Sequence, residues 1–175
     1  MHAPRFARDQ AELDQIGGRA KGWACPHCRR HGTLNRHGRV RGLGEREPGK
    51  DAVRGQRFFC SNRGWRRGCG KTFTVLLATL IRRATVRTGE LWRFYKAKLG
   101  GASVVGAWEG LGSRFSVEAA YGWWRRWRRG QFAVRSILAH GRDPPRGSVA
   151  ESLGGLFGAD DPVGNFQLME QRSWP

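Results

Sequence analysis

Four cysteines are the residues of this chain best suited to bind a metal ion. Cys25 and Cys28 form a C-x2-C pair, and Cys60 and Cys69 form a second pair with eight residues between them. Two thiolates on a tight turn can occupy two corners of a tetrahedron, and a second pair brought alongside completes it. We therefore predict one structural zinc ion per chain, bound by Cys25, Cys28, Cys60 and Cys69.

Two other interpretations of this region stay open. The cysteines could be merely buried or redox-active, and His27, His31 or His37 could replace one of them as a ligand. The wide spacing between Cys60 and Cys69 predicts a stretched loop on one side of the site. A closed site of four thiolates has no open position for water, so it implies folding rather than catalysis.

The second chemical feature is an excess of positive charge. The chain has 32 Lys and Arg residues against 14 Asp and Glu, for a formal net charge of +18, and 27 of the cations are arginine. Codon usage in a GC-rich genome could explain the preference for arginine but not the shortage of acids. A folded protein with this much charge repels itself, so the excess predicts a polyanionic partner. The planar guanidinium group also matches the geometry of phosphates.

The charge is concentrated in one part of the chain. Residues 21–150 have a net charge of +21, whereas residues 151–175 have a net charge of −3. The acids of the basic part have no paired spacing suited to Mg²⁺, so we expect no enzyme activity. The chain has no secretory signal and no run of about 20 apolar residues. We therefore expect a cytoplasmic, nucleoid-associated protein without a membrane partner.

The elements that must position these residues divide the chain into four parts. We predict a short N-terminal helix in residues 1–20 and a Gly- and Arg-rich cysteine region in residues 21–84. A helical region follows in residues 85–142, and residues 143–175 form a Gly-rich, acidic and poorly ordered tail. The apolar run at residues 75–81 could be a strand or the start of a helix, because periodicity alone cannot decide. A small β zinc ribbon in the cysteine region, followed by helices after residue 85, predicts an α+β fold.

The helical region contains the parts of a helix-turn-helix. Three helices are each preceded by a residue that can cap them: Thr88 before residues 89–99, Ser103 before residues 104–110, and Ser116 before residues 117–140. A glycine-bearing turn at Gly112 separates the second helix from the basic third one. In a helix-turn-helix, the second helix of the pair enters the major groove of DNA.

The tryptophans of the helical region have three interpretations. They could pack the core, stack on single-stranded bases, or form a surface for a partner or a membrane. We favour core packing, because three helices this short need large side chains to bury enough area. The aromatic residues concerned are Trp92, Phe94, Trp108, Trp124 and Trp127.

Several motifs resemble those of a known family. They are Cys25-Pro26-His27-Cys28, Gly32-Thr33, Arg36-His37-Gly38, Arg57-Phe58-Phe59-Cys60 and Gly68-Cys69-Gly70-Lys71-Thr72-Phe73-Thr74. Over residues 22–130 the chain resembles the zinc ribbon at the N-terminus of insertion-sequence transposases and of their small DNA-binding accessory proteins. The resemblance implies a small antiparallel-β zinc ribbon followed by a three-helix, helix-turn-helix-like domain. Residues 62–67 depart from the shorter loop of the family, and we do not expect transposase activity.

These observations together predict a protein that binds nucleic acid, with duplex DNA preferred. The expected role is that of an accessory or regulatory protein of a mobile element, with a transposase as a candidate protein partner. The alternatives are an RNA-binding or ribosome-associated zinc ribbon and, less favoured, a metal-dependent nuclease or transposase. The oligomeric state stays open.

The residues expected to contact nucleic acid lie around the cysteines and on the third helix. They are Arg29, Arg30, Arg36, Arg39, Arg57, Arg63, Arg66, Arg67, Lys71, Arg114, Ser116, Arg125, Arg126, Arg128 and Arg129. For the four arginines at 125–129 the alternative is a solvated helix face.

Overall fold

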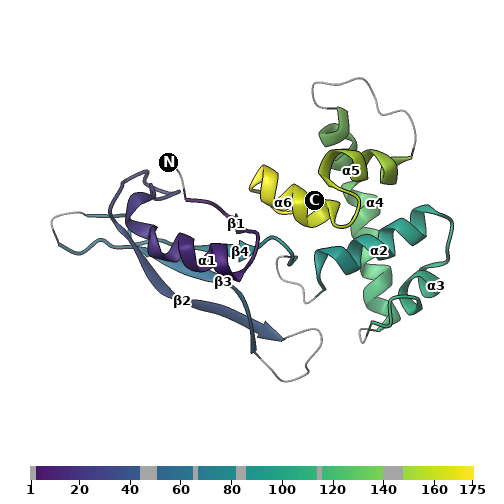
Figure 1. Cartoon of the computed structure of the whole chain (residues 1–175), viewed down its shortest axis with the longest axis horizontal. Helices are drawn as coiled ribbons and strands as arrows, with labels where there is room; N and C mark the ends of the chain where they lie inside the picture. The colour runs from purple at the N-terminus through teal and green to yellow at the C-terminus, as the bar shows by residue number, and fades with distance from the viewer. Residues whose placement is uncertain (1–2, 44–50, 65–66, 82–85, 114–115, 140–147) are drawn as a thin grey trace. The chain divides into compact units, whose positions relative to one another are not determined.

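The computed structural model has the predicted α+β class and divides into two compact units (Figure 1). It describes residues 3–43, 51–64, 67–81, 86–113, 116–139 and 148–175. The sheet unit consists of Met1–Val86 with Gln167–Arg172, and the helical unit consists of Arg87–Phe166 with Ser173–Pro175. Each unit is described by itself below.

The sheet unit contains a four-stranded sheet in the order β1-β4-β3-β2. The strands are β1 Phe6–Ala7, β2 Leu34–Leu43, β3 Asp51–Cys60 and β4 Thr72–Leu77. Strands β2, β3 and β4 are antiparallel neighbours, whereas β1 pairs with β4 in parallel. The expectation of a purely antiparallel sheet is therefore corrected to a mixed one. Strand β1 has two residues, which is too short to give an alternating pattern in the sequence.

One face of this sheet is covered by the N-terminal helix. Helix α1, Gln10–Gly18, lies across the sheet (Figure 1) and is followed by a short 3-10 helix, η1, at Ala20–Gly22. The Asp9 side chain caps α1 by accepting a 2.8 Å hydrogen bond from the Glu12 amide. The small core beneath the helix consists of Ala7, Leu13, Ile16, Ala20, Cys25, Leu34, Phe58, Cys60 and Val75. Two of the four cysteines thus belong to this core.

The segment Gln167–Arg172 pairs with the free edge of the sheet. The Gln171 side-chain oxygen accepts hydrogen bonds from the backbone amides of Arg5 (2.7 Å) and Phe6 (2.9 Å). The buried Gln167 amide donates to the carbonyls of Ala78 (2.8 Å) and Leu80 (3.0 Å). Gln171 thus satisfies backbone amides at the edge strand β1, and Gln167 satisfies backbone carbonyls in the turn that follows β4.

The helical unit contains the three predicted helices at nearly the predicted positions. They are α2 Thr88–Leu99, α3 Val104–Glu109 and α4 Val117–Ala139. Ser103 caps α3 by accepting a 2.9 Å hydrogen bond from the Gly106 amide, as predicted. Thr88 is instead the first residue of α2, because its hydroxyl donates to Asp161 at 2.5 Å. None of the helices in the described part of the chain is both long and apolar enough to cross a membrane.

Most of the tryptophans considered above pack the core of the helical unit. Trp92, Trp108 and Trp127 are almost fully buried. The Tyr95 and Trp127 rings lie 4.5 Å apart, and Trp108 meets Phe94 edge to face at 5.3 Å. The prediction of core packing is confirmed for these three. Trp124 is only half-buried and lies under the Lys98 ammonium group, 5.2 Å from its ring centre.

The tail expected to be poorly ordered forms two helices in its described residues. They are α5 Val149–Phe157 and α6 Pro162–Glu170. Ser148 and Glu151 form a reciprocal capping box at the start of α5, and Asp161 accepts a 2.9 Å hydrogen bond from Gly164 at the start of α6. Leu153 and Phe166 are fully buried, so apolar burial orders this segment despite its glycines. The start of the predicted tail, residues 143–147, lies outside the described residues.

Candidate metal centre and basic surfaces

The first cysteine pair sits on a tight turn before β2. The Cys25 amide donates to the Arg30 carbonyl at 2.9 Å, and the Arg29 amide donates to the Cys25 carbonyl at 2.8 Å. The His27 amide points at the Cys25 sulfur at 3.4 Å. Arg29, directly after Cys28, has a φ of 59°. This left-handed conformation closes the turn, and it is uncommon for a residue other than glycine.

The second cysteine pair repeats this arrangement between β3 and β4. The Cys60 amide donates to the Lys71 carbonyl at 2.9 Å, and the Gly70 amide donates to the Cys60 carbonyl at 3.0 Å. Gly70, directly after Cys69, has a φ of 71°. Gly70 and Lys71 thus correspond to Arg29 and Arg30 of the first turn. The two turns form equivalent cysteine knuckles.

The long spacing of the second pair is an insertion into such a knuckle. The Gly68 amide donates to the Ser61 carbonyl at 2.6 Å, so the residues on either side of positions 62–67 are held together. A side chain at Gly68 would clash, because its Cβ would lie 2.3 Å from the Cys60 sulfur. The expected stretched side of the site is therefore corrected: Cys60, Ser61, Gly68 and Cys69 alone form the second knuckle. Among the inserted residues, Asn62, Arg63, Gly64 and Arg67 are exposed.

The two knuckles bring all four sulfurs together. The Sγ atoms lie within 4.8 Å of one another, with 3.8 Å between Cys25 and Cys69 and 3.7 Å between Cys28 and Cys60. All four cysteines are free thiols rather than disulfides. A tetrahedral site with Zn–S bonds of about 2.3 Å has sulfurs about 3.8 Å apart. The four side chains therefore fit a single metal ion of this kind.

The four-sulfur cluster holds thiols of opposite acidity. Burial raises the pKa of the Cys25 thiol to about 12. Burial opposes ionisation of Cys28 as well, but hydrogen bonds from the Arg30 amide and the neighbouring sulfurs lower its pKa to about 7. A bound divalent cation would offset the burial penalty and deprotonate its thiol ligands. Four thiolates fill a tetrahedral site, so such an ion would have a structural role.

The histidines considered as substitute ligands lie elsewhere. His27 and His31 are exposed, and their rings approach backbone carbonyls of Thr72 and Gly22, each at 3.3 Å. The His37 ring lies beside Phe59. Within the described residues, the four cysteines are the only group of three or more Cys, His, Asp or Glu residues close enough to share a metal ion.

The sequence did not single out Thr33, which supports the cluster. Thr33 is buried, with 3% of its surface exposed, and its hydroxyl oxygen lies 3.1 Å from the Cys60 sulfur. The Cys60 thiol donates to this oxygen, and the Thr33 hydroxyl donates in turn to the Arg30 carbonyl at 3.4 Å, which ties Cys60 to the first knuckle. The motif Gly32-Thr33 marks the position, but threonine in a loop is too common to indicate such a role.

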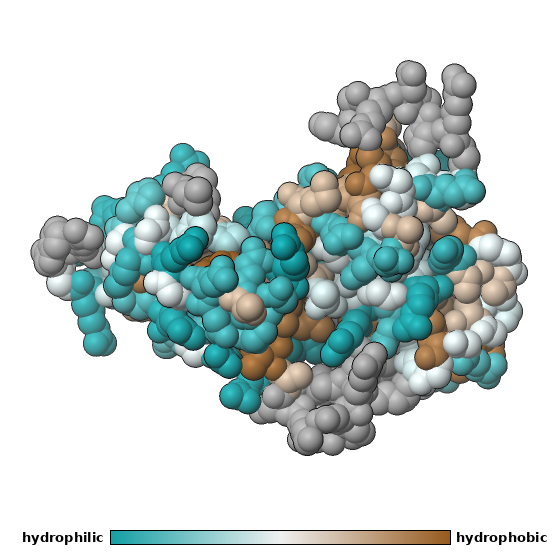
Figure 2. Space-filling model, viewed as in Figure 1, coloured by the Kyte–Doolittle hydropathy of each residue, from teal (hydrophilic) through white to brown (hydrophobic). Residues whose placement is uncertain are grey.

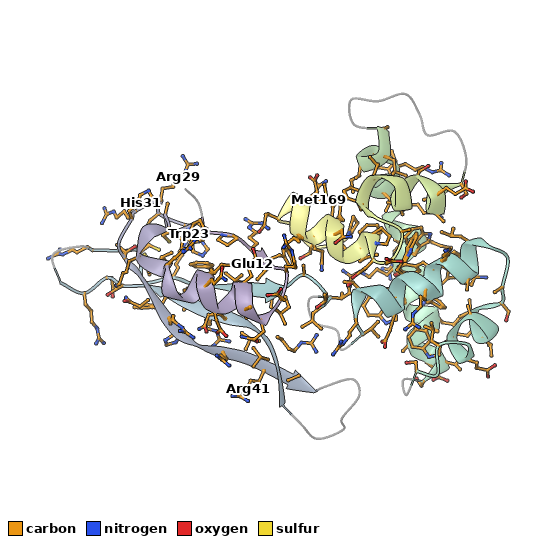
Figure 3. All side chains as sticks on the ribbon, viewed as in Figure 1. Glu12, Trp23, Arg29, His31, Arg41 and Met169 are labelled. Atoms are coloured by element: carbon orange, nitrogen blue, oxygen red, sulfur yellow. The ribbon has the colours of Figure 1, made fainter. Side chains whose placement is uncertain are left out.

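Exposed cations surround the metal centre in the sheet unit. Arg29, Arg30, Arg63, Arg67 and Lys71 are all exposed, and Arg29 points away from the sheet (Figure 3). The Arg30 guanidinium donates to the Arg67 carbonyl, which joins the first knuckle to the insertion in the second. The surface of this unit is mostly hydrophilic on the face drawn in Figure 2. Arg66 lies outside the described residues.

The remaining predicted contact residues divide between the strands and α4. On the strands, Arg36 and Arg39 lie 3.9 Å and 3.1 Å from the Asp14 carboxylate, and Arg57 is exposed on β3. Arg41, which was not predicted, also points outward from β2 (Figure 3).

On α4, the exposed residues among those predicted are Arg125, Arg128 and Arg129, and Ser116 is exposed just before the helix. The Arg126 guanidinium lies over the Trp123 ring at 5.4 Å. Arg114 lies outside the described residues.

Comparison with known proteins adds no family to these observations. No family model matches the chain, and neither a curated protein nor a solved structure matches it.

We predict one zinc ion per purified chain, lost in the variant Cys25→Ser. Removing one buried thiolate leaves three ligands, and because metal binding is coupled to folding, the sheet unit should lose its cooperative unfolding transition. Deletion of residues 62–67 is the matched control, because it removes the insertion and leaves the four residues of the second knuckle and all four sulfurs. Elemental analysis and thermal unfolding measure both effects. Stoichiometric zinc in Cys25→Ser, or its loss on deletion of the insertion, would contradict this assignment.

Proposed function

We propose that this chain is a zinc-dependent nucleic-acid-binding protein whose preferred partner is duplex DNA. The observation that carries the proposal is a set of exposed cations close in sequence to four cysteines whose sulfurs lie together. Such a cluster leaves a bound metal without an open position for a substrate, which favours a structural role. The cations beside it, among them Arg29, Arg63 and Lys71, are suited to phosphate groups.

The sheet unit supports the interpretation as a zinc ribbon. Its two equivalent knuckles flank the antiparallel strands β2, β3 and β4, and Cys60 is the last residue of β3. Metal binding at the end of the strands would hold them in register. The basic side chains would then be presented from a rigid base.

The helical unit supports the interpretation as a helix-turn-helix. The short helix α3 is followed by a turn in which Gly112 has a φ of 60°, and then by α4. Trp127 of α4 faces the core, whereas Arg125 and Arg128 are exposed. This division of α4 into an apolar and a basic face suits a helix that lies against DNA.

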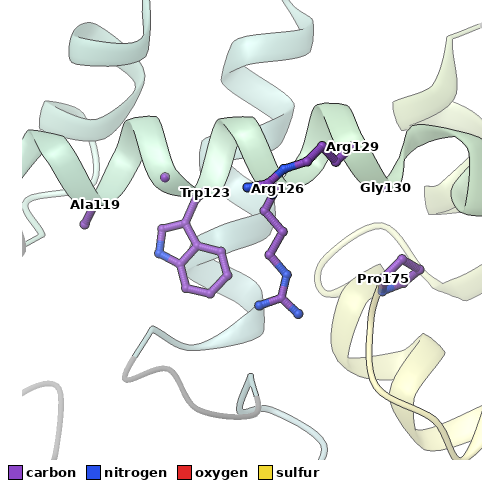
Figure 4. Close-up of a pocket in the computed structure, with 7 residues that line it drawn as sticks. Ala119, Trp123, Arg126, Arg129, Gly130 and Pro175 are labelled. Carbon is purple, nitrogen blue, oxygen red and sulfur yellow. The ribbon is translucent and has the colours of Figure 1, made fainter.

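A hollow beside α4 offers two arginines to the same ligand. Its volume is about 600 Å³, and Trp123, Arg126, Arg129 and Pro175 are among the residues that line it (Figure 4). Guanidinium groups next to an indole ring can bind a phosphate while the ring contacts the adjoining sugar or base. The hollow therefore supports a DNA-contacting role for this helix.

The role within a mobile element rests on the resemblance of the cysteine motifs described above. We propose an accessory or regulatory protein of this class, with a transposase as its protein partner. Co-purification with a transposase encoded beside it would support this role, and preferential binding of structured RNA would contradict the DNA preference.

We predict that α4 supplies several of the phosphate contacts. Replacing Arg125, Arg126, Arg128 and Arg129 by Ala should weaken duplex binding. It should also flatten the slope of log K against log salt by roughly 0.9 for each lost contact. Fluorescence titrations of a duplex over a range of salt concentrations measure both effects.

The control for this variant removes the same charge from another surface. It replaces four exposed arginines by Ala: Arg5 just before β1, Arg8 and Arg19 on either side of α1, and Arg172 after α6. This control should keep most of the wild-type slope. Equal slopes for the two variants would mean that net charge alone drives binding and would contradict a DNA-contacting α4.

We also predict that Arg29→Gly stabilises the sheet unit while it weakens duplex binding. Glycine adopts the φ of 59° at Arg29 more readily, so the free energy of unfolding should rise by about 0.5–1 kcal/mol. The control Arg30→Gly removes the same charge from a residue without a positive φ and should lower stability instead. Unchanged duplex affinity in Arg29→Gly would show that Arg29 makes no phosphate contact.

A further inference from the structure

The sheet has one face that is partly open. Leu34, Phe58 and Val75 point toward α1 and belong to the core. The neighbouring residues in each strand point to the opposite face, because side chains alternate along a strand. At the β1 end this face is closed, since Phe6, which pairs with Leu76, is 3% exposed. Over β2, β3 and the start of β4 it carries exposed and half-exposed residues.

An aromatic pair occupies the centre of this open part. Phe59 is only half-buried, and its strand partners are Asn35 on β2 and Thr72 on β4. The His37 ring is exposed and lies 5.9 Å from the Phe59 ring, at an interplanar angle of 43°. Arg57, two residues before Phe59 on the same face, is exposed as well. An aromatic residue thus stands beside a cation on a solvent-facing strand.

The backbone holds this aromatic pair in place. The register of β2 against β3 shifts between Arg36 and Arg39, and Gly38 in this bulge has a φ of 101°. Gln56, which is 2% exposed, donates to the carbonyls of Gly38 (2.6 Å) and Arg57 (2.9 Å). A buried amide that uses its donors in this way fixes the bulge, and with it His37 beside Phe59. The platform is therefore preorganised, which lowers the cost of binding a ligand.

The charges on this part of the sheet fit a polyanion. The register shift between Val40 and Arg41 leaves Arg54 as an extra residue of β3, so the alternation is interrupted there. Val53 packs against the core, and the Arg54 side chain next to it lies over Gly42 on the open face. Arg54 and Arg57 lie about 17 and 7 Å from Phe59 along the strand if each extended residue advances 3.3 Å. The acids of this unit whose side chains are described lie on or beside α1, at Asp9, Glu12 and Asp14, and at Glu170.

We propose that the open half of this sheet face is a stacking platform for single-stranded nucleic acid. Unpaired bases stack on Phe59 and His37, and Arg57 and Arg54 bind the phosphates that join them. Stacking on an exposed aromatic ring requires a free base face, which a continuous duplex does not offer along its sides. The platform rests on the proposed nucleic-acid function and adds a second mode of binding to it.

The test compares two probes on the zinc-loaded full chain. The probes are a fluorescent oligothymidylate of about 15 nucleotides, within the range of strand-binding sites, and a duplex of the same length. Phe59→Leu keeps an apolar side chain and removes the ring, so it should weaken binding of the single strand about five- to ten-fold. Duplex affinity and the thermal unfolding midpoint should stay nearly unchanged. The matched control Phe132→Leu removes a ring that is 83% exposed on α4, and it should alter neither affinity.

The outcomes separate the platform from the function on which it rests. Unchanged single-strand affinity in Phe59→Leu, or an equal loss for both probes, would overturn the platform and leave duplex binding intact as a function. Wild-type protein that binds neither probe would overturn both. If Phe59→Leu lowers the unfolding midpoint, crosslinking of wild-type protein to an oligonucleotide containing 5-iodouracil replaces it. Adducts on Phe59 or His37 are the expected result, and adducts confined to other residues would overturn the proposal.

Discussion

The convergence of four cysteine sulfurs is the constraint on which the sheet unit depends. Cys25 and Cys60 belong to its core, and the two knuckles join the start of β2, the end of β3 and the start of β4. This core is small, so apolar burial alone gives limited stability. The four sulfurs lie within 4.8 Å of one another, so a cation bound between them would add the free energy of metal binding to that of folding. The strands and a metal ion at this site would then stabilise each other.

This arrangement explains how a chain with a net charge of +18 can fold and still offer its charge to a partner. In the sheet unit, the sulfurs and the core hold the knuckles, while exposed arginines project from them. In the helical unit, buried aromatic rings hold α4, while its arginines remain exposed. Each unit thus has an apolar interior, which in the sheet unit includes two cysteines of the candidate metal site, beneath a basic surface. A polyanion would relieve the self-repulsion of such a surface, which is why we favour nucleic acid as the partner.

The sequence predicted those features that depend on local patterns. Helical periodicity and the cap at Ser103 located α2, α3 and α4, and cysteine spacing identified the four ligand candidates. The tail was missed because Gly154, Gly155 and Gly158 suggested disorder, although Ser148 and Glu151 already carried the pattern of a capping box. The resemblance had indicated the insertion at residues 62–67, but only the hydrogen bond from Gly68 to Ser61 shows that it leaves the second knuckle compact. The open sheet face depends on strand register, which one sequence does not reveal.

X-ray absorption at the zinc edge of the purified chain tests the central claim most directly, because it reports the atoms bound to the metal. The equivalent knuckles and the four neighbouring sulfurs predict a first shell of sulfur atoms alone at about 2.3 Å. A shell that contains nitrogen or oxygen would mean that histidine or water occupies a position. That result would contradict a closed structural site, because a metal ion with a bound water could also act in catalysis.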